Sequence, residues 1–217
     1  MAFLKSTWFR CITVLLAIAL IAGGLLAVLN DVLFVTPAER TERAMAKIYG
    51  QAKEITKVYL DIDADTNDEA NKNALTTAIE NDYGTITKIY VIGDIASGNY
   101  DLVYQSTGKD GYKGGTITLW VKAVVENDSI ANAKLDKVVL ESYDKQTLMG
   151  KFDAMYYEQF VKLYQSGKLF TANKKETDKV QNIIAGATKS SNASCNAINC
   201  VIENLKILNL GGGANEN

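Results

Sequence analysis

The sequence predicts an α+β domain with a mainly antiparallel sheet and flanking helices, preceded by one N-terminal transmembrane helix. Three observations predict this class. An uncharged apolar run occupies residues 11–29. β-Branched, alternating segments separated by turn-forming residues fill the middle of the chain. Among two later segments, 152–165 is rich in aromatic residues and is followed by Gly167, and 198–208 repeats apolar residues at helical spacing. We expect residues 1–35 to form a membrane anchor, 36–210 one folded domain with a stalk helix, and 211–217 a flexible tail.

The run at 11–29 contains 19 residues without a charge, with Trp8 and Phe9 before it and Asp31 after it. This length suffices to cross about 30 Å of hydrocarbon, so a single-pass anchor in membrane lipid is the first choice. A cleaved signal peptide is the alternative. Its apolar region typically has about 7 to 15 residues and ends in a small-residue cleavage site, whereas this run is longer and ends Ala-Val-Leu-Asn.

The basic residues around the run predict the topology. Lys5 and Arg10 lie immediately before it, and the nearest bases after it are Arg40 and Arg43. Because positive charge is enriched on the cytoplasmic side, we expect a cytoplasmic N-terminus, an extracytoplasmic soluble domain and a location in the cell membrane.

The soluble part opens with a predicted stalk helix from Thr36 to about Gln51, with Thr36 as its cap and Pro37 in its first turn. Residues 55–62 and 86–92 have strand composition, and a short helix is possible at 71–81.

Alternating carboxylates at residues 61–68 suggest a calcium loop, but the spacing is wrong. Such a loop requires Gly at its sixth position and Glu at its twelfth. Counted from Asp61, these positions hold Thr66 and Lys72, so a solvated acidic turn is the preferred interpretation and no metal site is expected.

A turn-rich stretch at 107–115 precedes a predicted strand at 116–125. A turn at 127–129 and a second strand at 131–141 complete an antiparallel hairpin. A loop at 144–150 then leads to the predicted helix at 152–165.

Composition excludes several classes of function. The chain contains no histidine, which excludes Ser-His and Cys-His nucleophilic catalysis and any histidine-ligated metal or haem. A net charge of −2 without clustered basic residues predicts no nucleic-acid partner. No two acids fall at a spacing that marks an acid–base pair, so no catalytic residue is assigned.

The cysteines give little evidence about function. Cys195 and Cys200 lie about 140° apart on the last helix and should not form a disulfide. Cys195 is expected in the core, and Cys200 is expected to point away from it as a free thiol.

Residues 182–191 predict a loop that enters the last helix. Gly186 and Ala187 allow other atoms close to the backbone, and Ser190 or Ser191 can cap the helix. A helix N-terminus favours an anion, Lys189 adds a positive charge, and Thr188 places a hydroxyl beside that site. Small residues followed by serines also open many helices that bind no ligand, so local chemistry alone leaves both interpretations open.

This segment resembles one in the FMN-binding domain of the Rnf electron-transport complexes (the G subunit) and of sodium-translocating NADH:quinone oxidoreductases (the C subunit). In that family, Asp-x-x-Ser/Thr-Gly-Ala-Thr carries FMN esterified through its phosphate to the final threonine. Gly186, Ala187 and Thr188 match the pattern. Ala185 stands where Ser or Thr is usual, and Asn182 stands where Asp is usual. The resemblance implies covalent FMN on Thr188, with Gly186, Ala187, Lys189 and Ser190 around it.

Two further segments carry the resemblance, which covers roughly residues 10–209 in the order of its elements. Gly111, Tyr112 and Gly114 match a Gly-Tyr-x-Gly stretch that precedes the central strands of the family. Thr147 and Leu148 match loosely a Glu-Thr-Pro-Gly-Leu-Gly loop that touches the flavin, although the proline is absent here. A helix-capping turn is the alternative for that loop.

The resemblance implies a covalent flavoprotein of electron transport, a redox-carrier subunit of an Rnf-type (ferredoxin:NAD) ion-translocating oxidoreductase, or translocase, complex. Its partners would be the other membrane subunits and, during maturation, a flavin transferase. The alternatives are a membrane-anchored extracytoplasmic binding domain without a redox cofactor, and a stand-alone extracytoplasmic flavoenzyme.

Overall fold

The computed structural model of the chain describes residues 7–33 and 35–210, so the expected tail at 211–217 lies outside the described residues. The chain divides into two compact units, Met1–Arg40 and Thr41–Asn217.

The first unit contains the apolar helix α1 (Thr7–Leu33). Within the described residues this is the one helix long and apolar enough to cross a membrane, and none of its span Cys11–Leu29 is buried. The expected single N-terminal helix is therefore present. Helix α2 (Pro37–Tyr49) starts at the predicted place. The Thr36 amide donates to the Glu39 carboxylate, and the Glu39 amide donates to the Thr36 hydroxyl, so the two residues cap this helix reciprocally.

The second unit is built on an antiparallel sheet with the strand order β1-β3-β4-β5-β6. The strands are β1 (Lys57–Asp61), β3 (Gly84–Asp94), β4 (Asn99–Gly108), β5 (Ile117–Val125) and β6 (Lys134–Tyr143). A short strand β2 (Ile79–Glu80) pairs with β3. Strands β7 (Phe170–Thr171) and β8 (Val180–Gln181) form a separate parallel pair. The mainly antiparallel α+β class and the hairpin of β5 and β6 are confirmed.

The prediction of a short helix at 71–81 is wrong. This stretch holds the end of a short 3-10 helix (Glu69–Asn71) and strand β2. The backbone at Leu75 bonds to strand β1 instead of to its own turn: its amide donates to the Tyr59 carbonyl, and its carbonyl accepts from the Asp61 amide. Long-range pairing has therefore replaced the local hydrogen bonds that a helix needs.

The acidic turn is also more than a solvated loop. Asp61 accepts a hydrogen bond from the buried Lys88 ammonium at 2.7 Å and another from the Tyr90 hydroxyl. Asp63 lies 3.0 Å from the same ammonium group. The two carboxylates therefore neutralise a lysine that strand β3 buries, and among the described residues no cluster suited to a metal ion occurs.

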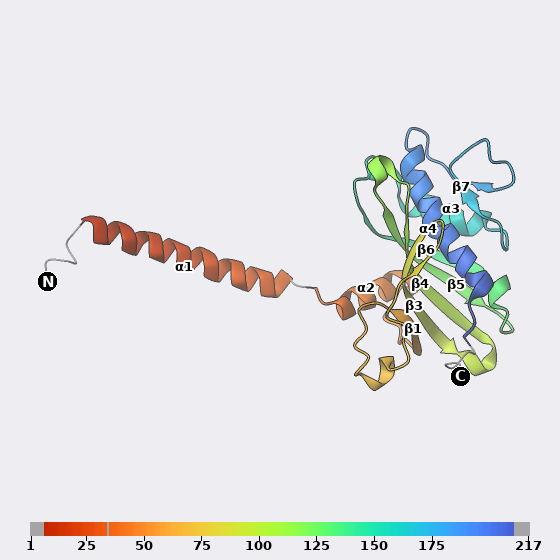
Figure 1. Cartoon of the computed structure of the whole chain (residues 1–217), viewed down its shortest axis with the longest axis horizontal. Helices are drawn as coiled ribbons and strands as arrows, with labels where there is room; N and C mark the ends of the chain where they lie inside the picture. The colour runs from red at the N-terminus through yellow and green to blue at the C-terminus, as the bar shows by residue number, and fades with distance from the viewer. Residues whose placement is uncertain (1–6, 34, 211–217) are drawn as a thin grey trace. The chain divides into compact units, whose positions relative to one another are not determined.

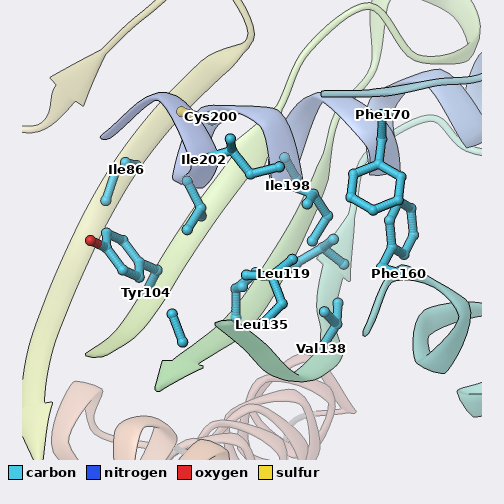
Figure 2. Packing of buried hydrophobic residues seen from close by; sticks show 14 of the residues in the cluster. Ile86, Tyr104, Leu119, Leu135, Val138, Phe160, Phe170, Ile198, Cys200 and Ile202 are labelled. Atoms are coloured by element: carbon cyan, nitrogen blue, oxygen red, sulfur yellow. The ribbon is translucent and has the colours of Figure 1, made fainter. Parts of the chain in front are cut away.

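One face of the sheet is covered by helix α4 (Thr188–Ile207), which lies across the strands (Figure 1). Its residues Ile198 and Ile202 pack on strand side chains such as Leu119 (Figure 2). Helix α3 (Ala154–Leu163) adds Phe160, whose ring meets Phe170 edge to face at 5.0 Å. The α3 helix begins where the Asp153 carboxylate caps it.

The opposite face is covered by the second part of α2. Ala44, Met45 and Ile48 are buried in one cluster with Tyr90 and Trp120. On β3, Tyr90 belongs to this cluster whereas its neighbours Ile89 and Val91 belong to the cluster under α4. Side chains alternate across a strand, so both faces of the sheet are buried.

Helix α4 runs very close to strand β4. A Cβ atom on Gly108 would lie 2.0 Å from the Ala193 carbonyl oxygen and 2.3 Å from the Ala197 amide nitrogen. The Ser106 hydroxyl donates to the Ala197 carbonyl at 2.9 Å. Gly108 and Ser106 on β4 therefore set the distance between helix α4 and the sheet.

The prediction that Cys200 points away from the core is wrong. Cys195 and Cys200 are both unpaired, as predicted, but both are fully buried. Cys200 is covered because α4 is enclosed on several sides: the Asn81 side chain reaches across and donates to the Cys200 carbonyl at 3.1 Å. Burial raises the pKa of the Cys195 and Cys200 thiols.

Candidate functional site

The candidate site begins at a sharp turn before α4. Gly186 has φ of +82°, a conformation that suits glycine, and the Ala187 amide donates to the Ile184 carbonyl across the turn. Thr188 is the first residue of the helix. Thr188 and Lys189 are exposed, whereas Ala187 and Ser190 are buried. The turn therefore presents the Thr188 side chain to solvent at a helix N-terminus.

The serines do not cap this helix, contrary to the expectation. Ala187 occupies the cap position, and no side-chain cap hydrogen bond is made there among the described residues. The helix starts earlier than predicted because the turn at Gly186 lets it begin at Thr188. Ser191 closes the preceding loop instead, since its hydroxyl accepts from the Ile184 amide at 3.0 Å. The first helical N–H groups thus lack a cap residue that could accept from them, which suits an anion.

Ser190 has a different partner, Gln146, in the loop after β6. The Ser190 hydroxyl donates to the Gln146 amide oxygen at 2.8 Å, and the Tyr112 backbone amide donates to the same oxygen at 3.0 Å. The Gln146 side-chain nitrogen donates to the Asp144 carbonyl at 2.7 Å. One amide group therefore joins the α4 N-terminus, the glycine-rich turn and the loop at 144–150.

The glycine-rich turn fits closely around this amide. A Cβ atom on Gly111 or on Gly115 would lie 2.6 Å from the Gln146 side-chain nitrogen. The turn closes on itself, because the Gly111 amide donates to the Gly115 carbonyl at 3.0 Å. Two side chains of α4 hold it from the other side: Asn196 donates to the Lys109 carbonyl at 2.9 Å, and Asn192 to the Asp110 carbonyl at 3.5 Å.

Unusual backbone conformations gather in these two loops. Asp110 and Lys113 in the turn, and Lys145 and Leu148 in the loop, all have φ between 52° and 65°. Such conformations are uncommon for residues other than glycine and are enriched at functional sites. The remaining non-glycine residues with positive φ in the described chain, Asn127 and Asp128, form the hairpin turn between β5 and β6.

Around this junction several side chains are exposed. Tyr112 is 37% exposed, with the Lys113 ammonium 5.5 Å from the centre of its ring. Leu148 is 51% exposed, and Thr147 is exposed beside it. All the residues predicted for the site therefore lie on segments that meet through Gln146. The structure records no direct bond between Thr188 and Tyr112, Thr147 or Leu148.

The two positions that depart from the family pattern have opposite environments. Ala185 is exposed. Asn182 is 2% exposed, and neither its side-chain oxygen nor its side-chain nitrogen has a hydrogen-bond partner. Its backbone is held, because the amide donates to the Thr171 carbonyl and the carbonyl accepts from the Cys195 thiol.

Three buried titratable groups, Tyr156, Tyr157 and Cys195, have pKa values that do not favour acid–base chemistry at neutral pH. Burial raises the pKa of the Tyr156 and Tyr157 phenols, although nearby serine hydroxyls act in the opposite direction. The pKa of the Cys195 thiol is raised as well, so burial disfavours the charged form of all three groups. None of these three buried groups is therefore an activated nucleophile.

Gln146 is the residue that sequence reasoning missed. A single glutamine in a polar loop has no periodicity, and its partners Tyr112 and Ser190 lie 34 and 44 positions away. The available signal was indirect: glycines at 111 and 115 suggest that something packs closely against that turn.

Comparison with protein-family models, with curated proteins and with solved structures found no match to this chain.

Proposed function

We propose that the chain is a membrane-anchored electron-transfer subunit of an Rnf-type ion-translocating oxidoreductase complex, with FMN esterified to Thr188. One observation supports this most directly. The three segments that resemble the flavin-binding family lie far apart in sequence, yet Gln146 joins them at one place.

The residues present fit an esterified phosphate. Thr188 offers an exposed hydroxyl at the start of a 20-residue helix, whose N-terminus favours negative charge. No side-chain cap competes with the anion in the described structure. Lys189 adds an exposed ammonium group next along the chain. In forming the ester, the Thr188 oxygen bonds to phosphorus, the hydroxyl proton leaves, and the bond from phosphorus to the leaving group of a flavin nucleotide donor breaks.

FMN supplies the redox chemistry when bound, so the protein needs only to hold and orient it. The exposed Tyr112, Thr147 and Leu148 side chains provide an aromatic, a polar and an apolar surface around the junction.

The proposed topology places the second unit outside the cytoplasm. Protease added to intact spheroplasts should digest it, because Lys5 and Arg10 favour a cytoplasmic N-terminus. An internal cytoplasmic protein must stay intact in the same sample. Full protection of the domain under those conditions would reverse the assignment.

The attachment is tested by colour after denaturation. The full-length protein, produced together with a flavin transferase, should stay yellow when unfolded, and Thr188→Ala should be colourless. Thr188→Ser keeps a hydroxyl at the helix start and should retain part of the colour. Lys189→Ala removes a countercharge and should lower loading without abolishing it. An unfolded wild-type protein without flavin would favour the alternative of a binding domain.

A further inference from the structure

We infer that Gln146 is a positioning residue for the Thr188 acceptor: it holds the first turn of α4 and the Tyr112 turn in one fixed arrangement. This inference rests on the proposed function for its consequence in flavin loading, but its structural part can be tested independently.

The hydrogen bonds around Gln146 fix the orientation of its side-chain amide. Its oxygen accepts from two donors, the Ser190 hydroxyl and the Tyr112 amide, while its nitrogen donates to the Asp144 carbonyl. A rotated amide would place its nitrogen against the Tyr112 amide and its oxygen against the Asp144 carbonyl. A glutamate at this position would keep the acceptor but would set a carboxylate oxygen against the Asp144 carbonyl.

Packing leaves the amide no room to move. Gly111 and Gly115 lie so close that a Cβ atom on either would come within 2.6 Å of the Gln146 nitrogen. Gln146 as a whole residue is 9% exposed. A buried amide whose oxygen accepts two hydrogen bonds and whose nitrogen donates one, packed against two glycines, is held close to one orientation.

The link to Thr188 is the first turn of the helix. Ser190 lies two residues after Thr188, within the same turn, so fixing the Ser190 hydroxyl also fixes how that turn faces the loops. The remainder of α4 is held by other contacts, including those at Gly108 and Ser106. Loss of Gln146 should therefore loosen the helix start while the domain stays folded.

The test compares Gln146→Leu, Gln146→Glu and Ser190→Ala in the full-length protein produced with a flavin transferase. Gln165→Leu is the matched control, because Gln165 is exposed and makes no side-chain hydrogen bond in the described structure. Gln146→Leu, which removes all three hydrogen bonds of the amide, should slow flavin loading about tenfold, and Ser190→Ala, which removes one, about threefold. Gln146→Glu should fall between wild type and Gln146→Leu. The control should load like wild type.

A second measurement separates this inference from the proposed function. In hydrogen exchange, the Tyr112 amide should be protected in wild type and lose roughly tenfold or more of that protection in Gln146→Leu, with faster exchange in the first turn of α4. This readout needs no flavin. If wild type does not load flavin, the proposed function fails, and exchange still decides the role of Gln146. Unchanged exchange at Tyr112, or loading in Gln146→Leu equal to wild type in a protein that does load, would overturn the inference.

Discussion

Gly108→Ala should destabilise the domain by about 3 kcal/mol, the upper end of the usual cost of overpacking. The added Cβ would lie 2.0 Å from the Ala193 carbonyl oxygen and 2.3 Å from the Ala197 amide nitrogen. Both obstacles are backbone atoms of α4, so no side chain can rotate away to relieve the clash. The helix must move away from β4, and the buried contacts of Ile198 and Ile202 with the sheet would weaken.

Chemical unfolding of the full-length protein in detergent measures this effect. Gly150→Ala is the matched control, because a Cβ at Gly150 would meet nothing within 4 Å. We expect a large drop in the unfolding midpoint for Gly108→Ala and almost none for the control. Equal midpoints for the two variants would show that α4 does not pack as closely against Gly108 as the structure indicates.

Asn182→Asp should also destabilise the domain, by about 3 kcal/mol at neutral pH. Asn182 is 2% exposed, and its side chain has no hydrogen-bond partner, so an aspartate there would be a buried carboxylate without a cation or donor. Asp is usual at this position in the family that this segment resembles. In this chain the position is buried and offers no hydrogen-bond donor, so it favours a neutral side chain.

The penalty depends on pH with a definite sign. Burial disfavours the charged form, so the pKa of the introduced carboxyl group in the folded state should rise above the unfolded value of about 3.9. Below that unfolded value the carboxyl is neutral in both states, and the charge penalty is absent. The penalty grows as the pH rises from there and levels off above the folded pKa.

Unfolding of wild type and Asn182→Asp across a range of about pH 4 to 8 tests this directly. The difference in free energy should widen with rising pH, whereas Ala185→Ser, at an exposed position, should stay within about 0.5 kcal/mol of wild type throughout. A difference that does not change with pH would mean that the carboxylate reaches water or a donor.

Local pattern was enough to predict several elements. The cap at Thr36 and Pro37 starts α2 where expected, because the capping bonds join residues three apart. The β-branched alternation at 116–125 appears as strand β5, and the aromatic helix at 152–165 as α3 within two residues at each end. In each case the signal lies within one short stretch of chain.

The elements that the sequence does not predict, or predicts wrongly, depend on contacts between residues far apart in the chain. The sequence does not predict strand β4, because polar residues such as Ser106 interrupt its pattern. Ser106 is buried, and its hydroxyl donates to the Ala197 carbonyl 91 positions away. Leu75 pairs with β1 instead of forming a helix. Gln146 has no local signal, since the contacts that matter come from Tyr112 and Ser190 on other segments.

In the candidate site, too, local sequence predicts some features and long-range contacts decide the others. Motif matching placed Thr188, Tyr112, Thr147 and Leu148 on three separate segments, and the fold brings those segments together. Ser190 was expected as a helix cap but instead bonds to Gln146, because the turn at Gly186 starts the helix earlier. Sequence spacing alone cannot show which of two neighbouring polar side chains faces another loop.

The central claim, that FMN is bonded to Thr188, is tested most directly by mass spectrometry of the denatured full-length protein produced with a flavin transferase. The account predicts that wild type is heavier than its sequence by one FMN less one water, and that the added mass lies on the peptide containing Thr188. Thr188→Ala should have the mass of the sequence alone. An added flavin mass that persists in Thr188→Ala, or a wild-type protein with no added mass, would contradict the account.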